Sequence, residues 1–154
     1  MNNLLEGIES TLEAYRECWS RLDFAALRQL WDAGELRPVY LAEEIPAPLF
    51  DWDGIEGYWT ATRGATRCIR IETWNLTVQP LATDLASALY DMRWIGEFTG
   101  YARPIGGDVR VSALFRRRDD SWRFIQYVEA PLAPIVYFRR CYERFADSPP
   151  SRGR

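Results

Sequence analysis

The chain has 154 residues and a net charge of −3, and it contains neither histidine nor lysine, so all 19 basic residues are arginine. This length fits one domain whose core needs no disulfide or metal ion for stability. The composition excludes acid–base chemistry by histidine and Schiff-base chemistry by a lysine amine, and the acidic balance argues against a nucleic-acid partner.

The N-terminal half is predicted to be mainly helical. Residues 4–22 repeat apolar side chains at helical spacing, and Asp23 is a suitable N-cap for a second helix that carries Trp31 on its apolar side. A short strand is expected over Pro38–Glu44. Asp53 resembles the first residue of a capping box and is predicted to open a third helix.

The C-terminal half is predicted to be mainly β-structure. A longer loop is expected over Gly100–Asp108 and a hairpin turn over Arg118–Ser121. Strands that follow an early helical block indicate an α+β fold with an antiparallel sheet. The four expected strands are Cys68–Gln79, Ala86–Thr99, Val109–Arg117 and Trp122–Glu129.

The end of the chain is predicted to add a final amphipathic helix, because Ile135, Phe138 and Phe145 recur at helical spacing. Residues 147–154 are expected to be a disordered tail, which leaves residues 1–146 as a single domain.

The location of the protein is predicted from its cysteines and its N-terminus. Three cysteines without a CxxC pair favour a reducing compartment and support no structural zinc site. The first residues lack a basic segment and no apolar run could span a bilayer, so neither a signal peptide nor a membrane partner is expected. We therefore expect a cytoplasmic protein.

Four segments carry a resemblance to a known family: AYRECWSRLDFAALRQLW, DWDGIEGYW, ALYDMRWIG and LFRRRDDSWRFIQYVEA. Over residues 4–130 the chain resembles the nuclear-transport-factor-2-like (SnoaL-like) superfamily, which includes ketosteroid isomerases, scytalone dehydratases and the association domain of calmodulin-dependent kinases. The resemblance implies a curved antiparallel or mixed sheet, closed on one side by three helices around a conical apolar pocket. It also implies a homodimer through the outer sheet face.

The resemblance to the isomerases implies two candidate groups. Tyr15 keeps the spacing to Asp23 that an oxyanion-holding tyrosine has in that family; the alternative is a buried core tyrosine. Glu44 would point where the isomerase base lies if it shared a face with Tyr40; the alternative is a solvated strand end. The second oxyanion donor of the isomerases falls on Ala113, so a classical ketosteroid isomerase is not expected.

The resemblance to the kinase association domain implies a pocket arginine at Arg93, with Glu129 opposite. In strand 86–99, Arg93 shares a face with Asp91, whereas Met92 and Trp94 lie on the other face. Charges usually face water, which favours the apolar face inside. The family match favours the opposite arrangement, with the charged face in the pocket and the apolar face in a dimer interface, and this is the arrangement we expect.

These observations predict a cofactor-independent lyase or isomerase that acts on a small aromatic or polyketide-like molecule. A carboxylate in a ring-lined pocket is expected to have a raised pKa. The alternatives are a non-catalytic binding or dimerisation module and a domain whose tryptophans fill its own pocket. The candidate catalytic residues are Tyr15, Glu44, Asp91 and Arg93, and the candidate substrate contacts are Trp19, Trp31, Tyr40, Tyr58, Trp59, Ala113 and Glu129.

Overall fold

The computed structural model describes residues 2–132. The predicted final helix and the predicted tail, within residues 135–154, lie outside this part of the chain. The elements are α1 (Asn2–Arg21), α2 (Phe24–Gln29), β1 (Val39–Leu41), α3 (Trp52–Ala65), β2 (Thr66–Ala82), β3 (Leu85–Phe98), β4 (Ile105–Arg118) and β5 (Ser121–Pro131). Within residues 2–132, no helix has the length and apolar character needed to cross a membrane.

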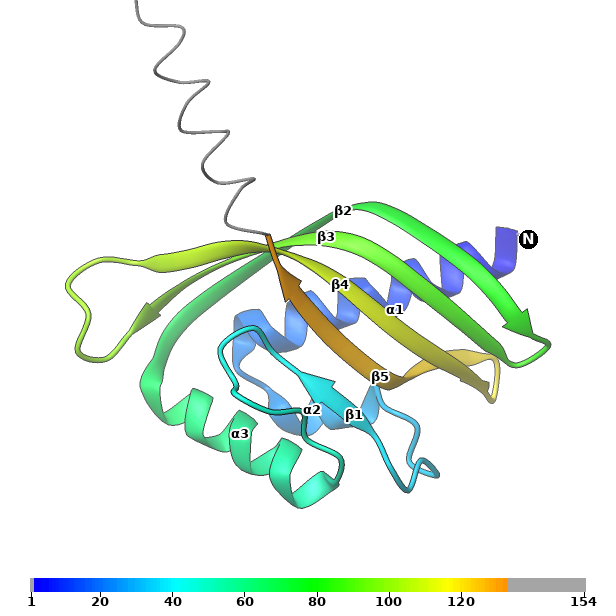
Figure 1. The fold of residues 1–154 in the computed structure, drawn as a ribbon, viewed down its shortest axis with the longest axis horizontal. Helices are drawn as coiled ribbons and strands as arrows, with labels where there is room; N and C mark the ends of the chain where they lie inside the picture. The colour runs from blue at the N-terminus through cyan, green and yellow to red at the C-terminus, as the bar shows by residue number, and fades with distance from the viewer. Residues whose placement is uncertain (1, 133–154) are drawn as a thin grey trace, which may run out of the picture.

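The strands form one mixed sheet in the order β1-β5-β4-β3-β2. Strand β1 pairs with β5 in parallel, and the remaining neighbours are antiparallel. Figure 1 shows the long strands arching over α1, with α2 and α3 on the same side of the sheet and β1 at its edge beside β5. The predicted α+β class, the mixed sheet and the helix order are therefore confirmed.

The starts of the second and third helices are set by aspartate caps. Asp23 caps α2 as predicted, because its carboxylate accepts a hydrogen bond from the backbone N–H of Ala26 at 3.0 Å. The predicted cap at Asp53 is wrong. Asp51 caps α3 instead: its extended backbone lets its carboxylate accept from the N–H of Gly54 at 2.7 Å, and Asp53 lies in the first turn.

Strand β4 begins earlier than predicted, so the expected loop over Gly100–Asp108 is shorter. Gly106 and Gly107 continue the antiparallel pairing with Ile95 and Trp94. A Cβ at Gly106 would lie 2.2 Å from the carbonyl oxygen of Trp94. These glycines therefore allow the backbones of β4 and β3 to approach each other closely within the sheet, and they do not mark a loop.

The core between the helices and the concave sheet face is built largely of aromatic rings. Trp31 follows α2 rather than belonging to it, and its neighbour Asp32 donates a backbone hydrogen bond to the carbonyl of Phe124 in β5 at 2.9 Å. The Trp31 ring lies 5.5–6.3 Å, centroid to centroid, from the rings of Tyr40, Trp52, Trp59 and Phe124. This segment joins the helical layer to the sheet.

A buried carboxylate fixes the segment after Trp31 to β4. Asp32, 3% exposed, accepts hydrogen bonds from the N–H of Gly34 at 3.0 Å and from the guanidinium groups of Arg116 and Arg118, both at 3.2 Å. Burial alone would raise the pKa of Asp32, but these hydrogen bonds outweigh it and lower the pKa below its usual value. Asp32 is therefore a charged structural group.

We expect Asp32→Asn to lower the free energy of unfolding at neutral pH by about 2 kcal/mol, because it removes charge-assisted hydrogen bonds from a buried site. The native pKa lies below the unfolded value, so this stabilisation is present above about pH 4 and is lost as the pH falls through the native pKa. Urea unfolding at pH 7 and pH 3 measures both effects. Asp120→Asn is the control, since Asp120 pairs with Arg117 but is 91% exposed; a similar loss in both variants would contradict the assignment.

Candidate functional site

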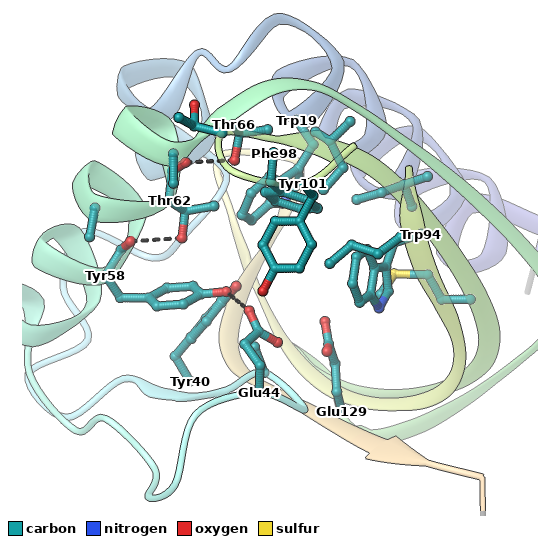
Figure 2. A pocket seen from close by; sticks show the side chains of 18 of the residues that line it. Trp19, Tyr40, Glu44, Tyr58, Thr62, Thr66, Trp94, Phe98, Tyr101 and Glu129 are labelled. Carbon is teal, nitrogen blue, oxygen red and sulfur yellow. Dashed lines mark hydrogen bonds between the residues drawn. The ribbon is translucent and has the colours of Figure 1, made fainter. Parts of the chain in front are cut away.

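A pocket of about 440 Å³ opens on the concave side of the sheet. Figure 2 shows Tyr58, Thr62 and Thr66 along one wall, Glu129 and Trp94 on the other side, and Glu44 beside the Tyr58 hydroxyl. Most of the lining is apolar, which suits a small organic molecule. The lining residues are Tyr15, Trp19, Tyr40, Ala42, Glu44, Tyr58, Ala61, Thr62, Ala65, Thr66, Ile69, Ile71, Met92, Trp94, Phe98, Thr99, Tyr101, Ile105 and Glu129.

Glu129 is the buried ionisable carboxyl group in this wall, 9% exposed. Its Oε1 accepts a hydrogen bond from the Tyr127 hydroxyl at 2.6 Å, and its Oε2 accepts one from the backbone N–H of Glu43 at 2.9 Å. Tyr127 and Glu129 both lie in β5, and strand alternation places their side chains on the same, inner face of the sheet. The two hydrogen bonds hold the carboxyl group in one orientation.

The protonation of Glu129 is shifted by its surroundings. Burial raises the pKa of Glu129 to about 7, and the negative charges of Glu44 and Glu43 add to the increase. The hydrogen bonds from Tyr127 and from the Glu43 N–H act in the opposite direction. Near neutral pH the group can therefore both accept and release a proton, which general acid–base chemistry requires.

Two consecutive glutamates after β1 have different partners. The Glu43 Oε1 accepts a hydrogen bond from the indole N–H of Trp94 at 2.6 Å, and a Cβ at Gly107 would lie 3.0 Å from the same oxygen. Glu44 accepts a hydrogen bond from the Tyr58 hydroxyl. Burial and the charge of Glu44 raise the pKa of Tyr58, so this phenol stays protonated and remains a donor.

Tyr15 reaches the same pocket from α1. Its ring stacks on that of Tyr127 with the centroids 5.4 Å apart, and Tyr127 stacks on Tyr40 at 5.3 Å. Burial raises the pKa of the Tyr15 hydroxyl well above its usual value, and the charge of Glu129 raises it further. Tyr15 is therefore a protonated phenol at the pocket wall, as an oxyanion donor would have to be.

Six predicted site residues are brought together by the fold, because Tyr15, Trp19, Tyr40, Glu44, Tyr58 and Glu129 all line the pocket. Three others, Trp31, Trp59 and Ala113, do not line it. Each of them is 1% exposed or less and packs in the core. They are therefore not in the pocket wall where they were expected, since other core side chains cover them.

The expected pocket positions of Asp91 and Arg93 are also wrong. Both lie on the outer face of β3, where Arg93 makes two hydrogen bonds to Asp108, at 2.7 and 3.1 Å, and Asp91 accepts one from Asn75 at 2.7 Å. Strand alternation then turns Met92 and Trp94 inward, into the pocket. The preference of charges for water was the correct signal, and the family match was misleading here.

The apolar dimer face expected on β3 is therefore absent. The outer face carries exposed apolar side chains at Trp74, Leu89 and Ile95 among the charged groups. A homodimer through this face stays a prediction.

Sequence reasoning missed three residues that define the site. Tyr127 could have been found from its position two residues before Glu129 on one strand face. Trp94 was expected, together with Met92, on the outer face of the sheet. Glu43 lies near the expected position of the isomerase base, but its contacts with Glu129 and Trp94 were not predicted, because β1 ends at Leu41 and strand alternation does not extend to it. Among residues 2–132, no cluster of three or more histidine, cysteine or acidic side chains could hold a metal ion.

Comparisons with known proteins agree with this architecture. The SnoaL-like domain model matches residues 8–134. No curated protein sequence matches the chain.

Three solved structures share the fold at low sequence identity. A proposed dehydratase of the NTF2-like family from Streptomyces avermitilis is 18% identical, with 86% of this chain and 99% of that chain covered and a TM-score of 0.74. A proposed scytalone dehydratase from Novosphingobium aromaticivorans is 13% identical, with 84% of each chain covered and a TM-score of 0.74. An NTF2-like superfamily protein from Salmonella enterica serovar Typhimurium is 12% identical, with 99% of each chain covered and a TM-score of 0.75.

Proposed function

Because this chain belongs to the SnoaL-like domain family, we propose that it is a cofactor-independent lyase or isomerase that moves a proton on a small organic molecule bound in the pocket. One observation carries the proposal: the Glu129 carboxyl group, with a pKa of about 7, lies in the wall of a largely apolar pocket. A carboxyl group with that pKa is suited to proton transfer at neutral pH.

The proposed step begins with the ionised Glu129 as general base. It takes a proton from a carbon next to a carbonyl group of the substrate, and the electron pair moves onto the carbonyl oxygen. Tyr15 donates a hydrogen bond to the oxyanion that forms. The electron pair then either expels a β-hydroxyl group, which leaves as water with the proton from Glu129, or takes the proton back at another carbon.

Two hydrogen bonds, one from a side chain and one from the backbone, support Glu129 in this role. Tyr127 donates to its Oε1 and contacts the Met92 sulfur at 3.5 Å, which places the phenol between β5 and β3. The backbone N–H of Glu43 holds Oε2. An oriented base loses less entropy on reaching the transition state than a mobile one.

The similar structures support an elimination in particular. Two of them are proposed dehydratases, which remove water from their substrates. The step above ends in the same class of reaction when a β-hydroxyl group leaves. Dehydration is therefore the first reaction to test.

A substrate panel tests the proposal. We would incubate the protein in D₂O with small ketones and β-hydroxy ketones, with and without aromatic rings, and follow C–H exchange and loss of water by NMR. The wild type is expected to convert or exchange at least one compound, and Glu129→Gln to lose this activity. Glu97→Gln is the matched control, since Glu97 is exposed on the outer face of β3.

Two results would contradict the proposal. One is equal exchange by the wild type and Glu129→Gln. The other is a compound that binds in the pocket, stabilises the wild type and is recovered with all its C–H bonds unexchanged, which would indicate a binding module.

A further inference from the structure

The charge of the pocket points to the charge of its ligand. Resting on the function proposed above, we propose that the substrate is a small organic cation, an amine or a quaternary ammonium compound. Its positive group lies beside Glu44 at the mouth of the pocket, and its apolar body extends inward to Glu129.

The arginines in the described part of the chain lie outside this pocket. None of those within residues 2–132 belongs to its lining, although the chain has 19 basic residues. Arg93, on the inward-curving strand β3, pairs with Asp108 on the outer face. Arg116 and Arg118 are held by Asp32 on the far side of the core. In the described part of the chain, the ionisable side chains that line the pocket are carboxyl and phenol groups.

Three carboxyl groups act on one another at this wall. Glu44 and Glu129 line the pocket, and Glu43 contacts its lining through Trp94. The negative charges of Glu44 and Glu43 both disfavour ionisation of Glu129, so the three carboxyl groups repel one another at this wall. An anionic ligand such as a carboxylate or a phosphate would add to this repulsion, whereas a cation would relieve it.

The aromatic rings around these carboxyl groups favour the same ligand. Tyr40 and Tyr58 lie 5.4 Å apart, centroid to centroid, and the Tyr58 hydroxyl is bonded to Glu44. Figure 2 shows Tyr101 over the same end of the pocket, across from Tyr58. Ring faces attract organic cations, and quaternary ammonium groups are commonly held in aromatic cages. Rings beside a carboxylate combine both attractions in one place.

Glu44 and Glu129 lie at different depths in the pocket, and we assign them different roles. Glu44 is exposed at the mouth and remains accessible to an ammonium group that keeps part of its hydration. Glu129 is buried further inside, where the carbon skeleton of the ligand would lie. The anchoring of the charge and the transfer of the proton are thus assigned to different residues.

Three compounds of similar shape test the assignment by binding alone. Phenyltrimethylammonium is the cation, tert-butylbenzene is its neutral counterpart, and benzoate is the anion. Trp19 and Trp94 line the pocket, so titration of tryptophan fluorescence reports occupancy. We expect the cation to bind about tenfold more tightly than the neutral compound, and benzoate to bind more weakly than either.

Variants connect this preference to Glu44. Glu44→Gln should lower the affinity for phenyltrimethylammonium about tenfold and leave that for tert-butylbenzene unchanged. Glu97→Gln, which removes the same charge from the outer face, should change neither affinity. Equal affinities of the wild type for the cation and the neutral compound, or tighter binding of benzoate, would overturn the proposal.

The outcome is separable from that of the proposed function. Glu129→Gln should keep a preference for the cation while losing turnover. Turnover that depends on Glu129 without any preference for cations would overturn only the ligand assignment. A preference for cations without turnover would overturn only the proposed reaction.

Discussion

Replacing Glu129 with glutamine should lower kcat/KM by about 10²–10⁴-fold, the usual contribution of a positioned general acid or base. Glutamine has nearly the same shape and can still accept the hydrogen bond from the N–H of Glu43. It cannot take up a proton from the substrate. Steady-state kinetics on a compound converted by the wild type measures the loss.

The pH dependence distinguishes a base from a group that only binds. Since the pKa of Glu129 is about 7, kcat/KM of the wild type should rise with pH and level off above about pH 7. The residual activity of Glu129→Gln should lack this inflection. A rate that falls as the pH rises through 7 would contradict the assignment of Glu129 as the base.

A stability measurement tests the same carboxyl group without a substrate. The native pKa lies above the unfolded value, so the fold favours the protonated form; this advantage is complete below about pH 4 and is lost as the pH rises through 7. A shift of the Glu129 pKa to about 7 corresponds to a loss of about 3 kcal/mol in the free energy of unfolding. Glu129→Gln should lack it, and an identical pH dependence in both proteins would contradict the buried, neutral state.

Trp31→Ala should lower the free energy of unfolding by about 3–5 kcal/mol, as removal of a buried tryptophan usually does. The Trp31 side chain is 1% exposed and contacts rings from β1, α3 and β5. Its loss leaves a cavity where the helical layer meets the sheet. Urea unfolding, followed by circular dichroism, measures the change.

Trp74→Ala is the matched control for this substitution. Trp74 is 38% exposed on the outer face of β2, so the same change of residue type should cost less than about 1 kcal/mol. The comparison also tests the correction of the sequence-based role of Trp31. A stability near that of the wild type together with weaker ligand binding would restore Trp31 as a substrate contact.

Local patterns in the sequence were sufficient for the order of the elements and for several of the site residues. Asp23 is a cap because its carboxylate reaches an N–H three residues on, which depends only on nearby chain. Tyr15 was placed in the pocket by its position on an apolar helix face and by the family resemblance. Its position in the wall agrees with that expectation.

Pairing between distant segments was needed for the rest of the site. The Glu129 carboxyl meets the N–H of Glu43 because β1 pairs with β5, and the Trp94 indole meets Glu43 across the pocket. Either face of β3 satisfies strand alternation, and the preference of charges for water is the one sequence signal that favours Arg93 outside. The register of the whole sheet settles it, with Arg93 exposed and Trp94 turned into the pocket. Residue spacing carries no information on contacts of that range. For this reason the sequence predicted Glu129 in the pocket, whereas its hydrogen bonds and its raised pKa were found only in the folded chain.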